Sequence, residues 1–165
     1  MKMELIQPFI NSADAVLAEM LQSPTKVVDV NMEDEAYRRK GVAAVITIVG
    51  DIEGRVIFDI ESAVAAKIAS ALAGTAVGES ESLVGETIFE LANQVIGNAV
   101  TTLNDQGFRF KISPPELHTA NEGTKTSEDT EALVLCFETP QGDVYMNVAM
   151  RYNRRRATER AAVAQ

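Results

Sequence analysis

The order of the predicted elements occurs twice along the chain, and this repeat constrains the fold more than any other feature. Apolar residues recur at helical spacing over residues 3–22, and a strand, a polar loop and a β-hairpin follow. After a linking helix the same order returns, beginning with a long helix. Two copies of one layout predict an internal pseudo-twofold, with mostly antiparallel strands in one sheet covered by long helices. The predicted fold class is therefore α+β.

The predicted bounds follow from apolar periodicity and from the Gly and Pro residues at the breaks. In the first unit we expect a helix at residues 3–22, strands at 26–30, 41–49 and 55–60, and then the linking helix at 61–73. In the second unit we expect a helix at 80–105 and strands at 108–112, 132–139 and 143–150. Polar loops are expected at 31–40 and 119–130, and hairpin turns at 50–54 and 140–142.

Length and composition predict one folded domain. The chain has 165 residues, of which 46% are hydrophobic and 24% charged, and a domain typically has about 100–150 residues. We expect a single domain over residues 1–150 and a basic tail over 151–165. No apolar run approaches the roughly 18 residues of a membrane span, and Glu4 lies where a signal peptide needs its apolar stretch. We therefore expect a cytoplasmic protein that does not bind a membrane.

The charge is divided unevenly between the domain and the tail. Residues 151–165 hold five arginines and one glutamate, a net +4, so the net charge of −9 leaves −13 on residues 1–150. An acidic domain repels phosphate backbones, so we expect no nucleic-acid partner. The arginine-rich tail fits either a solvated chain end, the commoner case, or a contact with an anion.

Several kinds of catalytic or metal site are excluded by residue counts. The single cysteine, Cys136, and the single histidine, His118, cannot form a disulfide within the chain or the usual zinc site. The chain also lacks a glycine-rich nucleotide loop and the Gly-x-Ser-x-Gly motif. Cys136 lies in an apolar strand, which predicts a buried small residue. His118 lies in a predicted loop, which predicts a surface or structural role.

The long helix has two different faces. Its apolar stripe must face the core and consists of Val84, Ile88, Leu91, Ala92, Val95 and Ala99. The opposite face carries polar residues and a glycine, namely Glu86, Glu90, Asn93, Gly97 and Asn104. Glu90 and Asn93 are three residues apart and therefore neighbours on the helix surface. A glycine inside a helix costs about 1 kcal/mol relative to alanine, and close approach of another backbone would account for Gly97. Spacing alone fits an ordinary solvated face as well as a functional one.

A resemblance to a known family now adds to this pattern. Glu90, Asn93, Gly97 and Asn98 stand in the order Glu-x-x-Asn-x-x-x-Gly-Asn, which resembles the signature helix of the CheC/CheX/FliY phosphatases of bacterial chemotaxis. The opening segment 6–13 and the run Ser113-Pro114-Pro115 after the long helix also resemble CheX. When the opening helix is superposed on the long one, Pro8 stands opposite Glu90 and Asn11 opposite Asn93. One intact copy of the signature on the long helix and one defective copy on the opening helix resemble CheX more than CheC.

The resemblance implies a reaction and roles for these residues. It implies hydrolysis of the aspartyl phosphate of a response-regulator receiver domain such as CheY, with Asn93 positioning the attacking water and Glu90 pairing with a lysine of the regulator. Glu86, Gly97 and Asn98 would contact the partner. The protein would need no metal or cofactor of its own, because the regulator carries Mg²⁺.

The resemblance also implies a homodimer and leaves two other functions open. One is a non-catalytic docking module that binds a receiver domain or the flagellar switch. The other is a regulator-binding protein of a pathway other than chemotaxis. The intact pair of Glu90 and Asn93 favours the enzyme, a protein aspartyl-phosphate phosphatase of the CheX type.

Overall fold

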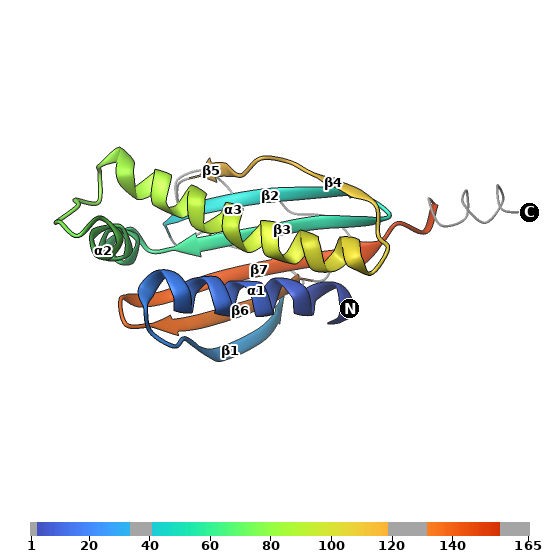
Figure 1. The fold of residues 1–165 in the computed structure, drawn as a ribbon, viewed down its shortest axis with the longest axis horizontal. Coiled ribbons are helices and arrows are strands. Elements are labelled where there is room, and N and C mark those ends of the chain that lie inside the picture. Colours follow the sequence, from blue (N-terminus) through green and yellow to red (C-terminus); the bar gives the residue numbers. More distant parts are fainter. Residues whose placement is uncertain (1–2, 34–40, 119–131, 156–165) are drawn as a thin grey trace, which may run out of the picture.

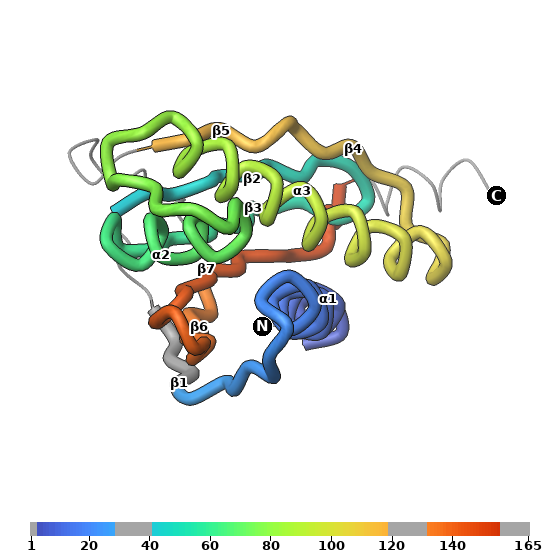
Figure 2. Tube along the Cα trace, turned by 60° about the vertical axis from the view of Figure 1, so that its left-hand side comes forward, coloured from blue at the N-terminus to red at the C-terminus, as the bar shows by residue number. Residues whose placement is uncertain are grey.

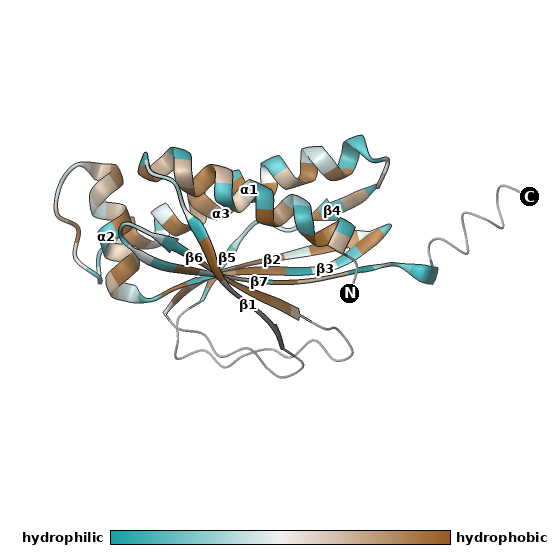
Figure 3. Cartoon of the chain, turned by 90° about the horizontal axis from the view of Figure 1, so that it is seen from below, coloured by the Kyte–Doolittle hydropathy of each residue, from teal (hydrophilic) through white to brown (hydrophobic). Residues whose placement is uncertain are grey.

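An antiparallel sheet forms one layer of the structure, and helices cover one of its faces (Figures 1 and 3). The structure is a computed structural model that describes residues 3–33, 41–118 and 132–155. Within these residues the elements are α1 (Met3–Leu21), β1 (Lys26–Glu33), β2 (Val42–Gly50), β3 (Ile52–Ile60), α2 (Ser62–Ala73), α3 (Ser82–Asp105), β4 (Phe110–Ile112), β5 (Glu116–His118), β6 (Ala132–Thr139) and β7 (Gly142–Tyr152). This arrangement confirms the predicted α+β class.

The sheet topology confirms the predicted pseudo-twofold. The strand order is β1-β6-β7-β3-β2-β4, and β5 also pairs with β2. The hairpins β2–β3 and β6–β7 meet at the centre, where β3 pairs with β7 from Ile52 opposite Tyr152 to Asp59 opposite Tyr145. The first strand of each unit then pairs with the hairpin of the other unit: β1 with β6, and β4 with β2.

The main core lies between the helices and the sheet. Alternate residues of the central strands face it, such as Val56 and Phe58 on β3 and Met146 and Val148 on β7, and all four are fully buried. From the other side, α1 and α3 pack next to each other on the sheet and contribute their apolar stripes (Figure 2). Each large apolar side chain buried in this way stabilises the fold by about 1.5–3 kcal/mol.

Local signals predicted most elements to within two residues. α2 ends where predicted, at Gly74, which adopts φ 73° and donates its backbone N–H to the Ser70 carbonyl. The hairpin turn before β7 is also confirmed. Cys136 is buried on β6, as predicted. Arg151 and Tyr152, the first two residues of the predicted tail, belong to β7, and the Arg151 Nε lies 2.8 Å from the Glu53 Oε1.

Three further bounds and one whole strand of the sheet differ from the prediction. β1 continues to Glu33, because residues 31–33 pair with β6; the rest of the predicted loop 31–40 lies outside the described residues. β3 begins at Ile52 rather than at residue 55, so the turn is shorter than predicted. β4 begins at Phe110 rather than at residue 108. β5 was missed, because a three-residue strand has no measurable periodicity and forms by pairing with β2.

His118 is consequently the last residue of a strand and not part of a loop as predicted. It is partly buried, stands opposite Ala43 of β2, and its Nε2 lies 3.5 Å from the Glu116 Oε2. The predicted loop 119–130 lies outside the described residues.

A substitution of Gly54, at the centre of the sheet, tests how closely β3 packs against β7. It has φ 155°, and a Cβ there would overlap the Ala149 carbonyl oxygen. We expect Gly54→Ala to lower the free energy of unfolding by about 3 kcal/mol, because overpacking and backbone strain add. Urea denaturation measures this.

The matched control is Gly74→Ala. Gly74 also has a positive φ, but a Cβ at this position would have no atom within 4 Å, so only the strain of about 1–2 kcal/mol should appear. Equal losses in the two variants would contradict the close contact at Gly54.

Candidate functional site

α3 presents the predicted site residues to solvent. This 24-residue helix buries Val84, Ile88, Leu91 and Val95 among others on the core side. Glu86, Glu90, Asn93, Gly97 and Asn98 are all exposed. The predicted division of α3 into a buried stripe and an exposed polar face is therefore confirmed, because a helix that buries one side against a sheet leaves the other in water.

Glu90 and Asn93 are held differently on this face. The Gln94 Nε2 donates a hydrogen bond to the Glu90 Oε1 at 3.3 Å. The Asn93 amide makes no hydrogen bond within the described residues and is available to an incoming molecule as both donor and acceptor. Sequence reasoning missed Gln94, although its spacing of four residues from Glu90 is the spacing at which helix side chains pair.

Gly97 lies one turn beyond Asn93 with open space in front of it. A Cβ at Gly97 would have nothing within 4 Å. No backbone of the described chain therefore approaches Gly97 closely, and the expected reason for the glycine is not found within the described residues. The predicted site offers another explanation for a glycine at this position, namely a contact with another molecule.

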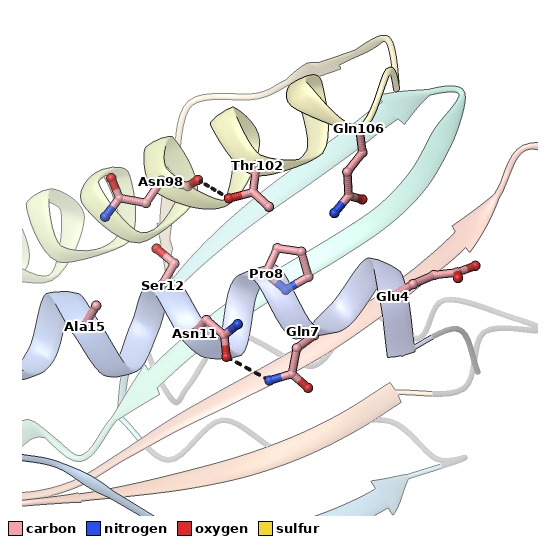
Figure 4. Close-up of a pocket in the computed structure, with 9 residues that line it drawn as sticks. All are labelled: Glu4, Gln7, Pro8, Asn11, Ser12, Ala15, Asn98, Thr102 and Gln106. Atoms are coloured by element: carbon pink, nitrogen blue, oxygen red, sulfur yellow. Dashed lines mark hydrogen bonds between the residues drawn. The ribbon is translucent and has the colours of Figure 1, made fainter.

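A groove between α1 and α3 adjoins this face. It has a volume of about 440 Å³, and its lining includes Gln7, Pro8, Asn11, Ser12, Asn98 and Thr102 (Figure 4). Asn98 is the predicted site residue that lines it; Glu86, Glu90, Asn93 and Gly97 do not. The Gln7 Nε2 donates to the Asn11 Oδ1 at 2.8 Å. The groove could not be predicted from local patterns, because its two walls are some 90 residues apart in the sequence.

Acidic residues dominate the charge of these two helices. α1 carries Glu4, Asp14 and Glu19, α3 carries Glu86, Glu90 and Asp105, and neither helix contains a lysine or arginine. The Tyr152 hydroxyl donates to the Glu4 carboxylate at one end of the groove, and this hydrogen bond raises the pKa of Tyr152 to about 12. The helical surface therefore attracts cationic groups and repels unpaired anions.

The described residues contain neither a candidate metal site nor a candidate membrane-spanning helix. No group of three or more histidine, cysteine, aspartate or glutamate side chains there is placed to hold a metal ion. None of the helices in this part of the chain combines the length and the hydropathy needed to cross a membrane.

A protein-family model matches the central part of the chain. The family model described as chemotaxis phosphatase CheX matches residues 42–138. No curated protein sequence matches the chain at a significant level.

Solved structures show the same fold over nearly the whole chain. A CheC-like superfamily protein from Shewanella sp. PV-4 is 23% identical with a TM-score of 0.81, and the match covers 92% of this chain and 99% of that one. The CheX–CheY–BeF3–Mg²⁺ complex from Borrelia burgdorferi contains a chain that is 29% identical with a TM-score of 0.73, covering 88% and 97%. FliY from Thermotoga maritima is 20% identical with a TM-score of 0.59, covering 86% and 84%.

A substitution of Gly97 tests whether the exposed face of α3 is optimised for the stability of the fold. Because a Cβ meets no atom there, we expect Gly97→Ala to raise the free energy of unfolding by about 1 kcal/mol. The melting temperature should rise by about 2–4 °C. Thermal denaturation followed by circular dichroism measures the change.

Gly85→Ala in the same helix is the control. Its Cβ would lie 3.2 Å from the Leu117 Cδ1, so its gain should be smaller. A Gly97→Ala protein that melts below the wild type would show that Gly97 serves the packing of this chain.

Proposed function

The chain belongs to the family of the chemotaxis phosphatase CheX, and on that premise we propose that it dephosphorylates the aspartyl phosphate of a CheY-like receiver domain. The observation that carries the proposal is the pair formed by Glu90 and Asn93 on the exposed face of α3, with open space at Gly97. The Borrelia burgdorferi CheX, which shares this fold, was solved in complex with CheY, BeF3 and Mg²⁺.

Asn93 orients the attacking water in this proposal. An acyl phosphate is already reactive, and the receiver domain supplies Mg²⁺ and a lysine, so the phosphatase has to place a water in line with the departing aspartate oxygen. A neutral amide can accept one hydrogen bond of the water and donate to a neighbouring oxygen. The exposed Asn93 amide, with no partner among the described residues, is suited to this role.

Glu90 anchors α3 to the partner. A carboxylate next to a phosphoryl group is unfavourable unless a cation lies between them, and the receiver lysine provides that cation in a charge-assisted contact. The hydrogen bond from Gln94 restricts the Glu90 carboxylate to one side of the helix. The absence of lysine and arginine from α1 and α3 removes competing cations from these two helices.

The remaining predicted residues form the contact surface around this pair. Gly97 lets the partner backbone approach α3, because no Cβ stands in the way. Glu86 lies one turn before Glu90, and Asn98 opens onto the groove beside α1. We also propose, from the family resemblance alone, that the protein acts as a homodimer.

A non-catalytic docking module is the second candidate. It requires binding alone, and a chain of the same fold, CheX from Borrelia burgdorferi, was solved bound to CheY. Phosphate release from a panel of phosphorylated receiver domains, with and without the protein, separates the two functions: a phosphatase accelerates release from at least one domain, and a docking module binds without acceleration.

Substitutions at Asn93 and Glu90 should separate rate from binding. If Asn93 only orients water, Asn93→Ala should slow single-turnover phosphate release by about 100-fold and leave binding of the phosphorylated receiver nearly unchanged. Glu90→Ala should weaken binding by about 2 kcal/mol or more, because it leaves the receiver lysine unpaired. Titrations and single-turnover assays on each variant measure both quantities.

Thermal denaturation is the control for both variants. Exposed helix positions usually change stability by about 0.5 kcal/mol or less, so neither variant should unfold. An Asn93→Ala protein that releases phosphate at the wild-type rate would end the catalytic proposal and favour the docking module.

Asn11 should not be a second active centre. It occupies the position of α1 that corresponds to Asn93, but Pro8 stands in place of the acid, and the Asn11 amide is bonded to Gln7. We expect Asn11→Ala to keep at least half of the wild-type rate of phosphate release. A folded Asn11→Ala protein as slow as Asn93→Ala would show that both helices act.

A further inference from the structure

Ser12 is a buried polar residue at the contact between α1 and α3. The residue is 6% exposed, and its Oγ donates a hydrogen bond to the Val95 carbonyl oxygen at 2.6 Å, across 83 positions of sequence. Figure 4 shows Ser12 pointing from α1 toward α3. In the part of the chain that the structure describes, no other hydrogen bond joins these two helices.

The rest of the contact between the helices is mainly apolar. Phe9, Ala13 and Val16 on α1, and Val95 and Ala99 on α3, are buried in the same core. Apolar contacts have no direction, and cores accept shifted packings of similar volume at modest cost. A hydrogen bond fixes distance and angle. The bond from Ser12 to Val95 therefore fixes how far α3 lies along α1.

The position of α3 along α1 matters for the proposed site. Val95 is two residues from Asn93 in the same helix, so any sliding of α3 carries Asn93 and Glu90 with it. Asn11 of α1 and Asn98 of α3 line the same groove, so a partner that docks on α3 at Asn98 would lie beside α1. A misplacement of about 1 Å can cost about 100-fold in rate when catalysis depends on orientation.

We propose that Ser12 is a positioning residue for this phosphatase: its hydrogen bond to the Val95 carbonyl sets the position of Asn93 along the axis of α1. The catalytic half of this inference rests on the proposed function, whereas the half that concerns the register of the helices does not.

Comparison of the two units related by the pseudo-twofold shows that only the first unit donates such a hydrogen bond. The superposition that places Asn11 opposite Asn93 places Ser12 opposite Gln94. Gln94 is exposed and bonds to Glu90 in its own helix, so it makes no corresponding bond to α1. α1 has Pro8 at the position that corresponds to Glu90 and supplies the buried hydroxyl that contacts α3.

The test measures helix register and catalysis separately. Spin labels attached to cysteines at two exposed positions, Glu19 of α1 and Asp105 of α3, report sliding of the helices as a change in the distance between the labels. The native Cys136 is buried and therefore protected from the label.

We expect Ser12→Ala to shift or broaden the distance distribution and to slow single-turnover phosphate release by about tenfold. Binding of the phosphorylated receiver should change less than about threefold, and Ser12→Thr should restore distance and rate.

The matched control is Ser70→Ala. Ser70 is a partly buried serine of α2 whose Oγ donates to the Ala66 carbonyl at 2.7 Å, so its loss should lower stability but leave the label distance and the rate unchanged. If Ser12→Ala does not fold, Ser12→Val replaces it, because valine has nearly the shape of threonine but lacks the hydroxyl donor.

Each outcome decides one half of the inference. An unchanged distance in Ser12→Ala overturns the register role, whatever the activity. A changed distance with the wild-type rate overturns the positioning role. A wild-type protein that dephosphorylates no receiver domain overturns the proposed function and the catalytic half together, and the distances still decide the register.

Discussion

Burial of the apolar stripes of α1 and α3 against one face of the sheet is the interaction on which the rest of the structure depends. The stripe of α3 is continuous from Val84 to Leu103, so the rotation of this long helix about its axis is set by the core. Once that rotation is set, the positions of Glu90 and Asn93 in the sequence determine that both face solvent on the same side. The candidate site therefore needs no separate scaffold, and substitutions on it need not disturb the core.

The two units share an architecture but differ in the residues at corresponding helix positions. α3 keeps an acid, an amide and a glycine on its outer face, where packing makes no demand. α1 has Pro8, Asn11 and Ala15 at the corresponding positions, and it turns Ser12 inward to the backbone of α3. An internal repeat allows this difference, because one helix can differ from the other as long as it still fills its half of the core.

The sequence predicted what depends on local signals and failed where pairing across the sheet decides. Helical periodicity identified both faces of α3, and Gly74 marked the end of α2. β5 and the last residues of β1 exist because another strand lies beside them, and nothing in their own residues requires a strand. The same limit applies to the site. Glu90, Asn93, Gly97 and Asn98 lie within one helix and could be found together, whereas the groove and the bond from Ser12 to Val95 depend on how α1 meets α3.

The exchange of outer strands between the units gives the chain the topology of a domain-swapped pair joined into one polypeptide. β1 completes the hairpin of the second unit, and β4 and β5 extend the hairpin of the first. Neither half alone can supply all the strands that flank its own hairpin. The covalent link through α2 keeps the halves at an effective concentration on the order of millimolar. Dilution therefore cannot dissociate them, and either half expressed as a separate fragment should need the other to complete its sheet.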